Sequence, residues 1–158
     1  MVTKQKKSVK AGKRVSTAHV DSLIRNYKQE RWSHNSRRIG KEDSLSVWYS
    51  IEELEEFMAT VKKQGGDGIK LYFGVYDENQ APQKEYVSRQ TIVLVATKEK
   101  ETPNGLMNKN LYVSTENGSS ILAYNAGSIC PPYCSGNDGF GGLGITIVDK
   151  GSEGLIVA

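Results

Sequence analysis

The sequence predicts an α+β fold in a single compact domain, with an antiparallel or mixed sheet of about five short strands and two helices. Three observations support this prediction. The chain has 158 residues, enough for one domain with a buried core. Two segments have apolar residues at helical spacing, and several others alternate as strands do. No run of about 18 apolar residues occurs, so we expect no membrane-spanning segment.

Charge is distributed unevenly along the chain. Residues 1–41 contain twelve Lys and Arg and two acids, a net charge of +10, whereas residues 42–158 contain nine and sixteen, a net charge of −7. Residues 1–15 have few apolar side chains and are predicted to form a disordered basic arm in front of a domain spanning residues 16–158. Four interpretations of this arm are open: it attracts a polyanion, it binds a protein partner, it lies on the acidic part of the chain, or it is only a solvated tail.

The first predicted helix begins at Ser16 or Thr17 and ends near Trp32. Its apolar stripe follows the i, i+3, i+4, i+7 spacing and consists of Val20, Leu23, Ile24 and Tyr27. A basic ridge lies on the flank of this stripe and is the candidate partner-binding site: Arg25, Lys28 and Trp32, continued by Arg37 and Arg38. The ridge suits phosphate contacts with a stacking tryptophan. Alternatively, Lys28 and Trp32 form a local cation–π pair.

The segment from Leu45 to Tyr76 has the clearest pattern in the chain. A short strand is followed by a helix that Ser50 and Glu53 begin with a capping box. We expect one face of this helix to be buried, with the residues Ile51, Leu54, Phe57, Met58 and Val61. Two glycines then supply a left-handed stop. The strand that follows alternates, and we expect its apolar set to face the core: Ile69, Leu71, Phe73 and Val75.

The next part of the chain predicts the remaining strands. Residues 86–97 form a long strand, whose β-branched run at residues 91–97 places it centrally in the sheet. A hairpin connects it to the preceding strand. Residues 98–110 are charged and predict a mobile loop with a turn at residues 103–105. Residues 111–114 and 121–124 predict two short strands joined by an Asn117-Gly118 turn.

The glycine-rich C-terminal region contains the candidate loop site. Its residues are Cys130, Tyr133, Cys134 and Asp138. The two cysteines suit half of a metal site, a local disulfide or a reactive thiol, but we favour a buried structural turn with free cysteines, because free cysteine packs as a small apolar residue. No metal site is predicted, since the chain has no second cysteine pair.

The segment Gly139–Gly144 fits G-x-G-x-x-G, a pattern of dinucleotide-binding loops. That pattern requires a helix after the glycines. Here a short strand at residues 145–148 follows instead, and residues 155–157 predict a last strand. We therefore expect no dinucleotide site, and no cofactor is predicted.

These patterns favour a non-catalytic, small cytoplasmic interaction domain that binds an unknown partner through its basic arm and first helix. The cytoplasm follows from having only two cysteines. One alternative is a small enzyme, or a ligand- or metal-binding protein, with its site in the Cys130–Cys134 and Gly139–Gly144 loops. A second is a nucleic-acid-binding protein. A third is a homo-oligomer in which the basic and acidic regions of neighbouring copies meet. No catalytic residue is predicted.

Overall fold

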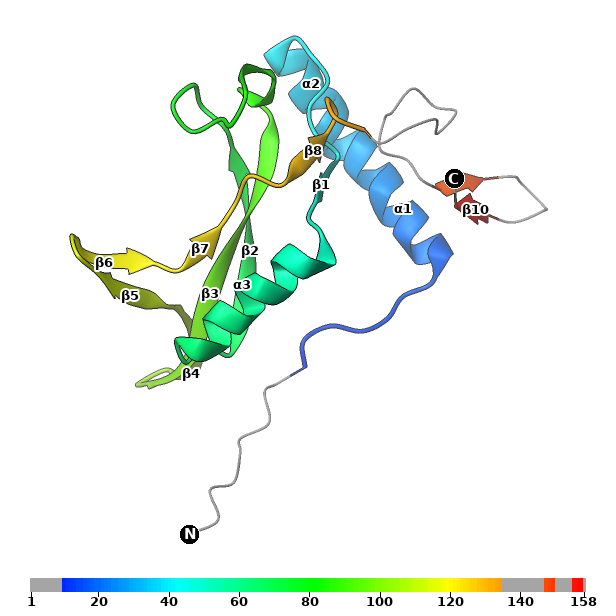
Figure 1. The fold of residues 1–158 in the computed structure, drawn as a ribbon. Coiled ribbons are helices and arrows are strands. Elements are labelled where there is room, and N and C mark those ends of the chain that lie inside the picture. The colour runs from blue at the N-terminus through cyan, green and yellow to red at the C-terminus, as the bar shows by residue number, and fades with distance from the viewer. Residues whose placement is uncertain (1–9, 135–146, 150–154, 158) are drawn as a thin grey trace.

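A long helical segment lies to one side of a twisted antiparallel sheet (Figure 1). The computed structural model describes residues 10–134, 147–149 and 155–157. The elements in chain order are α1 (Thr17–Tyr27), the π-helical turn η1 (Lys28–Trp32), α2 (Ser33–Ile39), β1 (Ser46–Trp48), α3 (Ile51–Lys63), β2 (Gly68–Val75), the 3-10 turn η2 (Lys84–Tyr86), β3 (Gln90–Thr102), β4 (Gly105–Asn110), β5 (Tyr112–Thr115), β6 (Gly118–Ile121), β7 (Ala123–Tyr124), β8 (Ser128–Cys130), β9 (Ile147–Asp149) and β10 (Leu155–Val157).

The main sheet has the order β2-β3-β4, and β7 also pairs with β3. Three two-stranded ribbons complete the strands: β1 with β8, β5 with β6, and β9 with β10. Every one of these pairings is antiparallel. The α+β prediction is therefore confirmed, as are the central position of β3 and its hairpin with β2. The strands are more numerous than the five expected.

The charged segment 98–110 was predicted to be a mobile loop, and this prediction is wrong. β3 continues to Thr102 and turns directly into β4, so that Lys98 pairs with Lys109 and Thr102 with Gly105. Gly105 has φ +100°, a left-handed conformation that glycine adopts without strain. These strand ends are largely exposed on both faces, so no buried face imposes an apolar alternation on their sequence.

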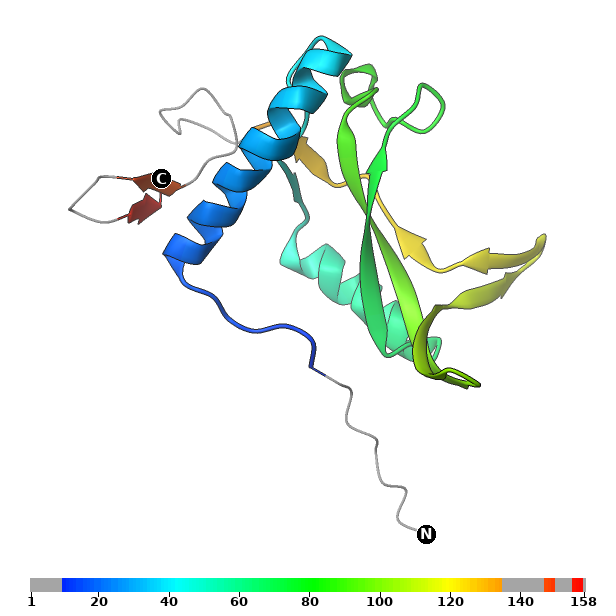
Figure 2. The same cartoon turned by 180° about the vertical axis from the view of Figure 1, so that it is seen from behind.

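The N-terminal helix is longer than predicted. The hydroxyl of Ser16 caps α1 by accepting from the backbone N–H of His19. The helix then continues without interruption beyond Trp32, through η1 and α2, to Gly40, where φ is +72°. Figure 2 shows α1 and α2 as one continuous rod beside the sheet. No proline or glycine stands between Ser16 and Gly40, so the sequence contains no strong helix breaker in this stretch.

The capping box of α3 is present as predicted. The hydroxyl of Ser50 accepts from the Glu53 N–H at 3.1 Å, and the Glu53 carboxylate accepts from the Ser50 N–H at 2.8 Å. The carboxylate also accepts from the hydroxyl of Tyr124 at 2.8 Å. These charge-assisted bonds lower the pKa of Glu53, chiefly through the Ser50 N–H. The helix ends before Gly65, whose φ is +86°.

Two small cores hold the described elements together. In the first, α3 packs on β3, and its buried members are Phe57, Val61, Leu94 and Ala96. Tyr124 of β7 extends it, because its ring stacks on Phe57 with centroids 5.2 Å apart. The second core joins Tyr76, Tyr86 and Ile129, and so attaches the β1–β8 ribbon to the sheet.

The expected burial of β2 is largely wrong. Leu71, Phe73 and Val75 share one face of β2, yet they are 62%, 80% and 66% exposed. The cause is the position of α3, whose buried residues pack on Leu94 and Ala96 of β3 and reach β2 only at Ile69. For the same reason α3 buries only part of its expected face, and its Ile51 and Met58 side chains are exposed.

Some predictions concern residues at the ends of the chain. Residues 1–9 of the basic arm, together with Asp138 and the Gly139–Gly144 segment, lie outside the described residues. Residues 10–16 are exposed and form neither helix nor strand. Strands are present at Ile147–Asp149 and at Leu155–Val157, close to the two predicted C-terminal strands. In the described part of the chain, no helix has the length and apolar character that crossing a bilayer requires.

Candidate functional site

An apolar groove opens between α1, β1 and the exposed face of β2 and β3. It has a volume of about 570 Å³. α1 contributes Leu23 and Ile24, β2 contributes Leu71 and Phe73, and β3 contributes Ile92. Monomeric proteins seldom leave a contiguous apolar surface of this kind open to water. The groove is therefore the strongest candidate for a binding site among the described residues.

The polar groups in the groove are already paired with one another. The hydroxyl of Tyr27 donates to the side-chain oxygen of Gln90 at 2.6 Å, and that of Tyr49 donates to the Ile92 carbonyl at 3.3 Å. Ser44 donates its hydroxyl to the Gln90 carbonyl. Burial raises the pKa of both tyrosines, so they remain neutral donors. The groove thus offers mainly apolar contacts, and the described residues that line it include no histidine, carboxylate or amine.

A junction of hydrogen bonds attaches the helical rod of α1, η1 and α2 to the segment before β1. Trp32 donates its indole N–H to the Asp43 carbonyl at 2.8 Å, and the Ser36 hydroxyl accepts from the Asp43 N–H at 2.9 Å. Arg89, which is buried, donates to the Glu42 carbonyl at 2.8 Å. Since these bonds tie both η1 and α2 to the segment before β1, they fix one wall of the groove.

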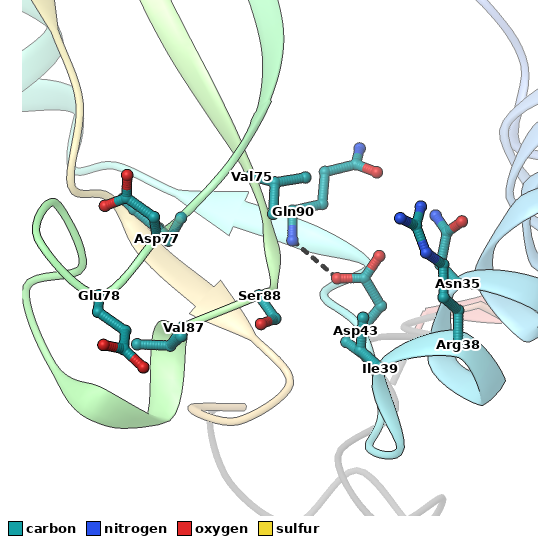
Figure 3. A pocket seen from close by; sticks show the side chains of 11 residues that line it. Asn35, Arg38, Ile39, Asp43, Val75, Asp77, Glu78, Val87, Ser88 and Gln90 are labelled. Carbon is teal, nitrogen blue, oxygen red and sulfur yellow. Dashed lines mark hydrogen bonds between the residues drawn. The ribbon is translucent and has the colours of Figure 1, made fainter.

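A second, polar pocket of about 680 Å³ lies between α2, Asp43 and the segments that follow β2 and precede β3 (Figure 3). Asn35 and Arg38 of α2 face Asp77 and Glu78, which follow β2. The carboxylate of buried Asp43 stands between them and accepts from the backbone N–H groups of Gln90 at 2.7 Å and Ser44 at 2.8 Å. Asp43 thus links α2 to β3, through its backbone N–H on one side and its carboxylate on the other. No cluster of three or more His, Cys, Asp or Glu suited to a metal exists in the described part of the chain.

The predicted basic ridge consists mainly of residues with local partners. Arg25 pairs with Asp21 at 2.8 Å, and the ammonium of Lys28 lies 5.4 Å from the centre of the Trp32 ring. This cation–π pair is the local alternative expected from the sequence. Burial lowers the pKa of Lys28.

The remaining two ridge residues lie further along the rod. Arg37 donates to the Nδ1 atom of His34 at 2.9 Å, and Arg38 lines the polar pocket. The Trp32 ring was predicted to stack on a base. Its indole N–H is bonded to the Asp43 carbonyl instead, and the side chain is half-buried in the junction. Trp32 is thus in part a structural residue.

The candidate loop site is a disulfide-closed turn. Cys130 is bonded to Cys134, so the free cysteines favoured from the sequence are a wrong prediction, and the disulfide alternative holds. Cys130 is buried at the end of β8, where its carbonyl accepts from the Leu45 N–H at 2.7 Å. Tyr133 donates its hydroxyl to Gln83 at 2.6 Å. While the disulfide is intact, neither sulfur can act as a thiolate nucleophile or a thiolate metal ligand.

Comparison with known proteins gave no assignment. No protein-family model matches the chain, and no curated protein or solved structure matches it.

The sequence pattern identified the apolar residues of the groove but assigned them to the core. Leu71 and Phe73 alternate as a buried strand face does, and nothing local distinguishes a covered face from an open one. No sequence pattern identifies Asp43 and Ser36 as junction residues, because the junction joins segments that only the fold brings together.

Proposed function

We propose that this protein is a non-catalytic interaction domain that binds a protein partner in the groove between α1 and β2. The observation that carries this proposal is the exposure of Leu71 and Phe73, 62% and 80%, on a wall of an apolar groove. Covering such side chains removes apolar surface from water, which is the main driving force of protein association. The described lining holds no histidine, carboxylate or amine, and the hydroxyls of Tyr27, Tyr49 and Ser44 are engaged in hydrogen bonds, which favours a binding role over catalysis.

The charges around the groove favour a partner surface with apolar residues and an acidic rim. The helical rod that forms one wall carries five Arg and Lys residues against two acids, Asp21 and Glu30, and the basic arm precedes it. Such a cluster raises the rate of association with an acidic partner. The arm and first helix, which the sequence singles out, therefore steer the partner, while the groove supplies the apolar contact.

Nucleic-acid binding stays a secondary proposal, because the basic arm attracts any polyanion. Binding of this kind should be unselective and should weaken steeply as salt rises. The described structure adds no further aromatic platform to Trp32 along the basic ridge.

A cytoplasmic location is proposed from the cysteine count. The Cys130–Cys134 disulfide argues against it, because reducing compartments keep most thiols free. Trapping thiols with an alkylating reagent in intact cells, followed by mass spectrometry, decides this point. Alkylated Cys130 and Cys134 would support the cytoplasm, and a protected pair would exclude a reducing compartment.

A peptide titration tests the groove directly. The probe is a short labelled peptide in which Leu and Glu alternate, and fluorescence polarisation measures its affinity. We expect binding to wild type and a loss of at least about tenfold in Leu71→Gln, which removes an apolar contact without adding charge. Leu106→Gln is the matched control, because Leu106 lies on β4, is 51% exposed and is not among the residues that line the groove. Its affinity should stay within about twofold of wild type.

Two further probes separate apolar from ionic contributions. A peptide with Lys in place of Glu should bind more weakly, because the helical rod is basic. A peptide of the same composition in scrambled order should also bind more weakly, since its apolar residues no longer share one face. Equal affinity of the Leu71→Gln and wild-type proteins for the Leu–Glu peptide would refute the groove as the binding site.

A further inference from the structure

We propose that the partner bound beside the groove is a second copy of this chain, paired through the free edge of β2. This inference rests on the proposed function and names its partner. Within the described residues, β2 pairs with β3 alone and is an end strand of the sheet. Its outer edge therefore presents the N–H and C=O groups of alternate residues, ready to pair with another strand.

β2 has few of the features by which edge strands avoid such pairing. It spans eight residues, contains no proline and carries one charged side chain, Lys70. Protected edges are short, charged or interrupted by proline. The exposed apolar side chains of β2 are thus attached to an edge that is long and open.

The other edge of the main sheet is formed by β4 and by β7, which has only two residues, and β4 is guarded by charge. β4 also pairs with β3 alone among the described residues, but its Lys109 lies opposite Lys98, and Lys100 is two residues further along β3. A second copy approaching this edge brings the same lysines and is repelled by them. Of the two edges, only β2 suits association of identical copies.

A two-fold axis at Tyr72 gives β2 a self-complementary register. In an antiparallel pair of identical strands centred there, Leu71 lies opposite Phe73 of the second copy, and Ile69 lies opposite Val75. These four side chains share one face of β2, on which Leu71, Phe73 and Val75 are exposed and Ile69 is half-buried against the first core. The two Lys70 side chains each face Gly74, so no like charges are opposed. The pairing joins two main sheets into one and sets the two apolar rows side by side, so that each removes part of the other from water.

The charge distribution also suits a symmetric pair. The first 41 residues carry +10 and the rest of the chain carries −7. In an isologous dimer each basic segment has an acidic body on the other copy to face. The rod beside the groove is basic, whereas α3, beyond it, exposes Glu52, Glu55 and Glu56.

Sedimentation velocity of the full chain at about 5–200 µM tests the dimer. Wild type should sediment as a dimer at the upper end of this range. Leu71→Lys should raise the dimer dissociation constant at least about tenfold, because it places a charge in the apolar row. Leu106→Lys, the matched change on the guarded edge, should leave it within about twofold. Circular dichroism checks that each variant is folded.

Amide hydrogen exchange of wild type supplies a test that needs no variant. Exchange in β2 should slow as protein concentration rises, while exchange in β4 should not change. A wild-type protein that stays monomeric throughout the range would overturn the second copy as partner, and so would a dimer that Leu71→Lys leaves intact. In either case binding of the Leu–Glu peptide in the groove is measured independently, so the proposed function survives or fails on its own result.

Discussion

Two phenylalanines offer a matched test of how α3 and β2 pack. Phe57 is 6% exposed and stacks on Tyr124, whereas Phe73 is 80% exposed on the open face of β2. Replacing each by alanine deletes the same atoms. The cost should differ because only one ring leaves a cavity.

Phe57→Ala should lower the free energy of unfolding by about 3–5 kcal/mol, the usual range for a buried phenylalanine. The ring contacts the Leu94 and Ala96 cluster, and α3 has no other buried aromatic residue to fill the space. Phe73→Ala should change the free energy of unfolding by less than about 0.5 kcal/mol, as exposed substitutions do.

Urea denaturation followed by circular dichroism measures both values. Protein concentration should be kept low, so that association through β2 does not stabilise the wild type. If Phe73→Ala were as destabilising as Phe57→Ala, the β2 face would be covered, and the groove would not exist as described. If Phe57→Ala were neutral, α3 would pack on the sheet by another face.

Four further predictions concern the cap of α3, the pH dependence of the Glu53 contribution, the junction and the disulfide. Ser50→Ala should lower the free energy of unfolding by about 1 kcal/mol in urea denaturation, by removing the cap of α3. Because the pKa of Glu53 is lowered in the folded state, its stabilising contribution is present above the ordinary Glu pKa and is lost as pH falls through the folded value; the difference in thermal midpoint between wild type and Glu53→Gln should therefore shrink on acidification. Trp32→Phe should cost about 1–3 kcal/mol, since it leaves the Asp43 carbonyl without its indole donor, and a cost near zero in urea denaturation would show that this bond does not hold the rod. Reduction of the Cys130–Cys134 bond, whose sequence separation is 4, should cost about 2 kcal/mol in wild type and nothing in the Cys130→Ser/Cys134→Ser variant.

The elements that local chemistry determines could be predicted from the sequence. The Ser50–Glu53 capping box and the Gly65 stop act within one turn, so the limits of α3 follow from neighbouring residues. The position of β3 in the sheet follows from its β-branched run, which suits burial on both faces.

The candidate site could not be predicted in the same way. Whether Leu71 and Phe73 are buried depends on where α3 lies over the sheet, and that position is set by contacts between distant segments. The strands around Lys98 and Lys109 were not predicted, because exposed hairpin ends have no apolar alternation in their sequence. The spacing of Cys130 and Cys134 was compatible with a disulfide, a metal or a thiol, and only their placement in the fold selects the disulfide.

The central claim is that a partner binds against β2 and α1. Amide hydrogen exchange tests it most directly. Exchange is measured with and without a saturating amount of the Leu–Glu peptide, at a protein concentration below the dimer dissociation constant. We expect slower exchange in β2 and around Leu23 and Ile24, with no change in β4. Slower exchange confined to residues 10–16, or to the polar pocket around Asp43, with β2 unchanged, would contradict it.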